Sequence, residues 1–148
     1  MPGATGNWET VNTALYTMLQ SLSGEGLRMA TVSDWPNPAP ANGYPHVFPL
    51  PLRKKEVDYD TAANKNKIFF ILRIEFPEPG TRESHLDMLK SADALETEIR
   101  QKTHAGLGGV VHNFQVGDNG EFARTGEGEA ELIVYDVVVS AEVLKDIA

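Results

Sequence analysis

The chain has 148 residues, of which 41% are hydrophobic and 23% charged, and it contains no cysteine. This length and composition suit one globular domain with one core. The formal net charge of −8 argues against broad, sequence-independent binding to nucleic acid, because such binding depends on lysine and arginine neutralising phosphates. The lack of cysteine excludes disulfides and cysteine-based zinc sites.

The start of the chain carries no recognisable targeting signal. Residues 1–10, MPGATGNWET, have neither a basic region nor an apolar run, so we expect no signal peptide. Residues 1–6 are small and contain glycine, and we expect them to be flexible. The longest purely apolar run, 68–72, is five residues, whereas a membrane-spanning helix needs about 20. We therefore expect no membrane partner.

An amphipathic pattern predicts a first helix over residues 8–23. Its apolar residues fall on one helical face, namely Val11, Leu15, Met18, Leu19 and Leu22. Asn7 is suited to cap the start of this helix, and Gly24 or Gly26 is suited to end it.

Weak strands and loops are predicted after this helix. Residues 27–31 alternate as in a short strand, and 33–45 contain four prolines, which indicates an extended loop. Residues 46–50 predict an edge strand, because Pro49 cannot donate a ladder hydrogen bond. The polar stretch 52–66 has no clear period, and we interpret it as a long loop or a projecting hairpin.

Residues 67–76 give the clearest strand pattern in the chain. Alternate residues form one apolar face, namely Ile68, Phe70, Leu72, Ile74 and Phe76. A second helix is predicted over 84–103. Its core stripe consists of Met88, Ala92, Leu95 and Ile99.

Two further strands are predicted over 109–116 and 129–140, separated by a polar, acidic loop or hairpin at 117–128. Residues 141–148 are expected to add about one helical turn. The order of the elements predicts a single α+β domain over 1–148. We expect a mixed, largely antiparallel β-sheet of four to five strands, with two α-helices packed on one face.

The stretch 104–120, HAGLGGVVHNFQVGDNG, raises the question of a phosphate-binding loop. Such a loop leaves a strand and enters a helix, whereas these glycines follow a predicted helix and precede a strand. No Lys-Ser or Lys-Thr pair follows them. We therefore expect Gly106 or Gly108 to end the helix in the left-handed conformation, and we expect no cofactor.

The sequence also lacks a motif for catalysis or metal binding. The histidines, at positions 46, 85, 104 and 112, do not have a ligand spacing such as HExxH, and no serine lies in a G-x-S-x-G elbow. Carboxylates gather around the turn at 77–80, where solvated charges are usual. We therefore expect no catalytic, cofactor-binding or metal-binding residue, and we expect that the protein is not an enzyme.

Candidate interface residues lie in the polar stretch and in the proline-rich loop. The basic triplet at 53–55 stands out in an acidic chain; it is either a solvated loop or an electrostatic contact to an acidic partner or a neighbouring copy. The tryptophan at 35 either anchors an interface or holds the proline-rich loop on the body. The candidate interface residues are Arg53, Lys54, Lys55, Asp58, Tyr59 and Trp35.

Several segments, taken in order, carry a resemblance to a known family. An amphipathic helix is followed by YPHVFPLP, by the polar LRKKEVDYDTAANKN, by the strand KIFFILRIEF, by HLDMLKSADALETEI leading into LGGVV, and by EAELIVYDVVV. This order resembles the tail terminator, or tail completion, proteins of long-tailed bacteriophages, the class that includes minor tail protein U of lambdoid phages. The resemblance covers most of the chain.

The resemblance implies a structural virion protein without catalytic activity. Such proteins form a ring, usually a hexamer, on the head-proximal end of the tail tube, where the ring ends tube polymerisation. The implied partners are further copies of the chain, the tail tube protein and the head–tail connector, while genomic DNA passes through the lumen without specific binding. The protein would be made in the cytoplasm of the bacterial host and located in the tail or neck of the virion. The stretches 52–66 and 117–128 would be candidates for contacts to tube or connector.

Two other functions remain compatible with the sequence. One is another neck or tail-completion protein of the same fold. The other is a small dimeric ferredoxin-like ligand-binding domain. The size of the oligomer separates the ring from the dimer.

Overall fold

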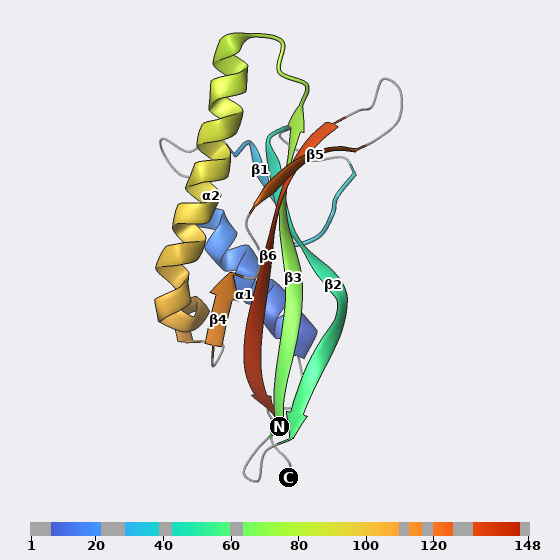
Figure 1. Cartoon of the computed structure of the whole chain (residues 1–148), viewed down its shortest axis with the longest axis vertical. Coiled ribbons are helices and arrows are strands. Elements are labelled where there is room, and N and C mark those ends of the chain that lie inside the picture. The colour runs from blue at the N-terminus through green and yellow to red at the C-terminus, as the bar shows by residue number, and fades with distance from the viewer. Residues whose placement is uncertain are drawn as a thin grey trace.

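A computed structural model describes residues 7–21, 29–38, 43–59, 64–109, 113–116, 120–125 and 132–145. It shows an α+β fold, as the sequence predicted (Figure 1). The elements are α1 (Asn7–Gln20), β1 (Thr31–Val32), β2 (His46–Tyr59), β3 (Asn64–Pro77), α2 (Arg82–Gly109), β4 (Asn113–Val116), β5 (Glu121–Thr125) and β6 (Leu132–Lys145).

The strands form one mixed sheet around three long strands. The order across the sheet is β1-β2-β3-β6-β4, and β5 pairs with β6 off this path. The β1–β2 pair is parallel, and the other described pairs are antiparallel. One edge of β6 pairs with β3. The other edge of β6 pairs with β4 at residues 139–142 and with β5 at residues 132–136. The order β1-β2-β3-β6-β4 thus contains five strands. The additional strand, β5, lies within 117–128, which we expected to be an acidic loop or hairpin.

The polar stretch 52–66 is built into a long hairpin. β2 continues to Tyr59 and β3 begins at Asn64, so the described part of this stretch is strand. The two strands pair from His46 opposite Glu75 to Tyr59 opposite Asn64. Backbone pairing therefore makes a strand of residues whose side chains show no strand period.

One face of the sheet builds the core. Residues directly opposite one another on β3 and β6 share a face, and Phe70 and Tyr135 on this face contact Trp8 of α1 and Glu96 of α2. The core cluster includes Val11, Leu15, Met18 and Leu19 of α1, Ile68, Phe70, Leu72, Ile74 and Phe76 of β3, Met88, Ala92, Leu95 and Ile99 of α2, and Ile133, Tyr135, Val137, Val139 and Ala141 of β6. The apolar stripes predicted for 67–76 and for both helices are thus confirmed within the described residues. We call this side of the sheet the core face and the other side the outer face.

The predicted end of the second helix is wrong. α2 runs for 28 residues to Gly109, so Gly106 and Gly108 lie inside the helix instead of ending it. A glycine inside a helix costs only about 1 kcal/mol relative to alanine, which tertiary contacts readily offset. The end of α2 contacts β4, which lies beside it (Figure 1).

The predicted end of the chain is also wrong over the residues that the structure describes. Residues 141–145 extend β6 and do not form a helical turn, because they pair with 64–68 of β3. The first strand is at Thr31–Val32, later than the 27–31 expected. The expectations for residues 1–6, Leu22, Gly24, Gly26 and 110–112 fall outside the described ranges.

β2 is an edge strand for most of its length. β1 pairs only with His46 and Val47, and the carbonyl of Val47 accepts a hydrogen bond from the Ser33 amide on that side. Backbone groups of successive residues point to opposite edges of a strand. The nitrogens of Pro49 and Pro51 therefore point to the edge of β2 away from β3, as the carbonyl of Val47 does. Proline has no N–H to offer, so the edge of β2 at residues 49–51 is poorly suited to pair with another strand.

Gly120 is expected to be sensitive to substitution. A Cβ added there would lie 1.8 Å from the Tyr135 hydroxyl oxygen. Tyr135 is buried and donates a hydrogen bond to Glu96, so it cannot yield without losing that bond. We predict that Gly120→Ala lowers the free energy of unfolding by about 1–3 kcal/mol.

Chemical denaturation of the two glycine variants checks this. Gly80→Ala is the matched control, because a Cβ at Gly80 meets nothing within 4 Å. It should change the free energy of unfolding by less than about 0.5 kcal/mol. Equal stability of the two variants would contradict the prediction.

Candidate functional site

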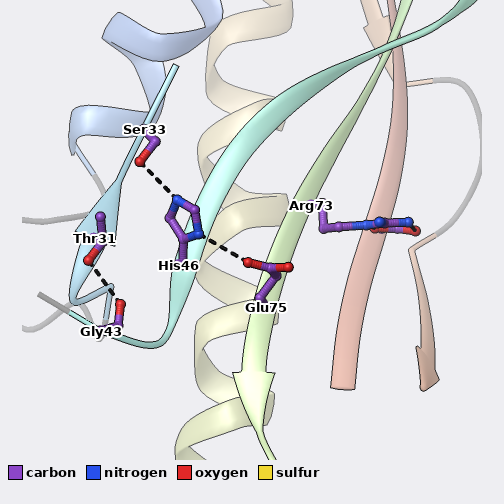
Figure 2. A network of polar contacts seen from close by, with 7 residues as sticks. Thr31, Ser33, Gly43, His46, Arg73 and Glu75 are labelled. Atoms are coloured by element: carbon purple, nitrogen blue, oxygen red, sulfur yellow. Dashed lines mark hydrogen bonds and ion pairs between the residues drawn. The ribbon is translucent and has the colours of Figure 1, made fainter. Parts of the chain in front are cut away.

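A polar network joins β1, β2 and β3 at the start of β2 (Figure 2). The His46 side chain is fully buried, with Nδ1 3.1 Å from Oε1 of Glu75 and Nε2 2.8 Å from Oγ of Ser33. Beside it, the Thr31 hydroxyl donates to the Gly43 carbonyl over 2.9 Å. The network therefore ties the two-residue strand β1 to the rest of the sheet.

The position of His46 follows from the register of three strands. His46 lies opposite Thr31 on β1 and opposite Glu75 on β3. Gly43, whose φ of 79° is easily adopted only by glycine, precedes β2 and brings the chain into this register. The Phe48 ring lies 4.7 Å from the imidazole, centroid to centroid, and helps to keep water from it.

The network has the order of groups found in a serine–histidine–carboxylate triad. Catalysis by a triad requires a substrate to reach both the serine oxygen and the imidazole. Here the imidazole is 0% exposed and has the Phe48 ring against it. What this geometry provides is a histidine with both ring nitrogens bonded, which fixes three strands to one another. No local sequence pattern indicates this network, because Ser33, His46 and Glu75 meet only through strand pairing.

Replacing His46 tests this clamp. His46→Phe keeps a ring of similar shape but leaves the Ser33 hydroxyl and the Glu75 carboxylate without their partner. We predict a loss of about 1–3 kcal/mol in the free energy of unfolding, measured with denaturant. Ser33→Ala, which removes a single bond to the ring, should lose about 1 kcal/mol or less. A fully stable His46→Phe protein would show that the network does not hold the strands.

A bidentate ion pair lies next to this network on the outer face. Arg73 of β3 donates from Nε and Nη2 to the two carboxylate oxygens of Asp136 on β6, each over 2.8 Å. The two residues are directly opposite in the register. The hydrogen bond to Asp136 raises the pKa of the Arg73 guanidinium above its usual value, so Arg73 stays charged. Because the pair is mutually satisfied, it needs no ligand to neutralise it.

The carboxylates near the turn at 77–80 are also used in pairing. Glu78 is held by the Arg124 guanidinium through both oxygens, and this hydrogen bonding lowers the Glu78 pKa. Burial, followed by the hydrogen bond to Glu96, raises the pKa of the Tyr135 hydroxyl. Glu75 is bonded to His46, Glu78 to Arg124 and Tyr135 to Glu96. These three pairs are separate and do not form one general acid–base pair.

The candidate interface residues lie on two different elements. Trp35 is on the loop after β1 and is 53% exposed. This loop is held by a bond from Asn12 Nδ2 to the Asp34 carbonyl, 2.9 Å, and by one from the Asn37 amide to the Trp35 carbonyl, 2.8 Å. Trp35 is thus an exposed aromatic ring on a fixed loop, which is a common form of interface anchor.

The other five candidates all lie on β2. Their positions there are Arg53, Lys54, Lys55, Asp58 and Tyr59. The register shifts between Pro51 and Lys55, so residues 52–54 stand opposite Phe69 alone and form a bulge. Bulges bend a strand and redirect its side chains. The side chains of these five residues are outside the described part of the structure.

An open groove lies between α1 and the edge of β2. Among the described residues, its lining consists of Trp8, Glu9, Asn12, Pro51 and Phe70, and its volume is about 660 Å³. Trp8 packs edge-on against Phe70 at 5.6 Å between ring centroids. A smaller pocket, about 220 Å³, lies between Tyr44 and the 77–80 turn. The sequence did not indicate the groove, because its walls come from three distant segments.

Within the described ranges, no three histidine or carboxylate groups are placed to share a metal ion. No helix in those ranges is both long and apolar enough to cross a bilayer. A comparison of the chain with protein-family models and with curated protein sequences finds no match.

Proposed function

We propose that the protein is a structural component of a bacteriophage virion, a tail terminator. It forms a ring of identical subunits at the head-proximal end of the tail tube. One face of the ring binds the last layer of the tube protein, and the other receives the head–tail connector. The protein acts through the geometry of these interfaces and not through catalysis.

The order of elements supports this proposal. A helix, a proline-containing segment, a long hairpin, a second helix and a final long strand follow one another as in the resemblance drawn from the sequence. The polar groups described above pair within the chain, as His46–Glu75 and Arg73–Asp136 do. A body whose polar groups are already paired suits a structural subunit.

The β2–β3 hairpin is the observation that carries the proposal most directly. It places the basic triplet 53–55 at a bulge of an edge strand, in a chain of net charge −8. A local basic segment on an acidic body favours contact with an acidic partner surface and fixes its orientation. The acidic balance of the remainder suits a lumen through which DNA slides without binding.

Native mass spectrometry over a range of protein concentrations tests the ring. Six copies of the 16.2 kDa chain give about 97 kDa, a closed assembly of head-to-tail interfaces. We predict a species of this mass, either alone or when purified tail tubes are added. A dimer at every concentration, with no binding to tubes, would favour a small ligand-binding domain instead.

The basic triplet gives a second prediction. Replacing Arg53, Lys54 and Lys55 together with glutamate should raise the concentration needed for half-assembly, or for tube binding, by about tenfold or more at low salt. Near 1 M salt the difference from the unaltered protein should shrink, because the screening length falls to about 3 Å. The triple glutamine variant, which removes charge without reversing it, should lie between the two. Unchanged assembly at low salt would show that the triplet is only a solvated segment.

A further inference from the structure

The groove lies beside the free edge of β2, and at residues 49–51 this edge is poorly suited to bind a further strand. Pro51 forms one wall, and Pro49 and Pro51 direct no N–H outward along this edge. Aromatic rings of Trp8 and Phe70 form the apolar part of the lining, and Glu9 adds a negative charge. A surface of this kind suits an apolar side chain carried on a helix, with a basic residue beside it.

The described surface offers one helical segment with these properties. Leu89 of α2 is 37% exposed, and Lys90 next to it is also exposed. Leu86, one turn earlier, is half-buried on the same side of the helix, so the pair has the i, i+3 spacing of groove-binding helices. Lys90 has the charge that complements Glu9.

The other exposed large apolar residues of the described chain are not on a helix and fit the groove less well; Val116, for example, is on the strand β4. Phe122 packs against Tyr135 at 4.6 Å between ring centroids, and Tyr44 lines the smaller pocket. Trp35 is on the loop that Asn12, a groove residue, holds. A contact between Trp35 and the groove of another copy would therefore pair one region with itself, which gives a two-fold dimer and not a ring.

The groove and the Leu89 surface belong to different elements of the chain: the described lining of the groove is on α1, β2 and β3, and Leu89 is on α2. In Figure 1, β2 is on the right and α2 on the left, with β3 and β6 between them. When two different patches of a chain bind each other, they make a head-to-tail contact, which closes into a ring when the rotation between copies permits. A second copy is therefore the occupant that this arrangement favours.

We infer that the α2 surface formed by Leu86, Leu89 and Lys90 of one copy docks into the groove between α1 and β2 of the next, with Lys90 against Glu9. This inference rests on the proposed ring and names the contact that builds it. The fixed Trp35 borders this contact on the groove side, where it would lengthen the apolar surface that is covered.

Charge reversal tests the contact. Glu9→Lys and Lys90→Glu, each made singly, should raise the concentration for half-assembly at least about threefold, because each places like charges together. The double variant should return it to within about twofold of the unaltered protein. Leu89→Asp should raise it by about tenfold or more. Glu121→Lys, on β5 and not part of either surface, is the control with the same charge change and should assemble normally.

The outcomes separate this contact from the ring itself. Both charged residues and Leu89 are exposed, so thermal unfolding of each variant should match that of the unaltered protein. A 97 kDa ring that tolerates the single reversals and Leu89→Asp would overturn the contact and leave the proposed function standing. Single reversals that weaken the ring without rescue by the double variant would overturn the pairing of Glu9 with Lys90. An unaltered protein that forms no ring, even with tail tubes, would overturn both the proposed function and the contact.

Discussion

The antiparallel pairing of β3 with β6 is the constraint on which the rest of the molecule depends. The two strands are paired without a shift from Asn64 opposite Lys145 to Pro77 opposite Leu132. Side chains directly opposite one another share a face, so this single register puts the alternate apolar residues of both strands on one side. A slip of one residue would put Phe70 and Val139 on opposite faces of the sheet, so that one strand would turn its apolar residues away from the helices.

This register also decides where the two helices can lie. α1 and α2 each have one apolar stripe and bury it against the core face, where Trp8 meets Phe70 and Tyr135 meets Glu96. No helix among the described residues covers the outer face, which includes cross-strand pairs such as Arg73–Asp136. Polar residues there satisfy one another within the sheet, which removes the cost of unpaired groups in a partly buried surface.

The edge of β2 is the part of the sheet that matters most for the proposed function. At the start of β2, His46 fixes β1 through Ser33 and β3 through Glu75, and β1 then ends at Val32. Beyond that point the edge of β2 has prolines and a groove, and further along it has a bulge with the basic triplet. Such an edge resists addition of a strand but leaves side-chain surfaces for partners. This combination suits the proposed ring subunit, which assembles in one geometry and then stops.

The α+β class, the two helical stripes and the apolar face of 67–76 could be predicted from the sequence alone, because each rests on a local period of apolar residues. The sequence did not determine the extent of β2, β6 or α2. Residues 52–59 and 141–145 become strand by pairing with β3, and Gly106 stays helical in an α2 whose end contacts β4. Nor did it indicate the groove or the His46 network, whose members are 13 and 29 positions apart in the chain. Local pattern sets which face of an element is apolar; only the tertiary pairing of distant segments decides how far a strand continues and which side chains meet.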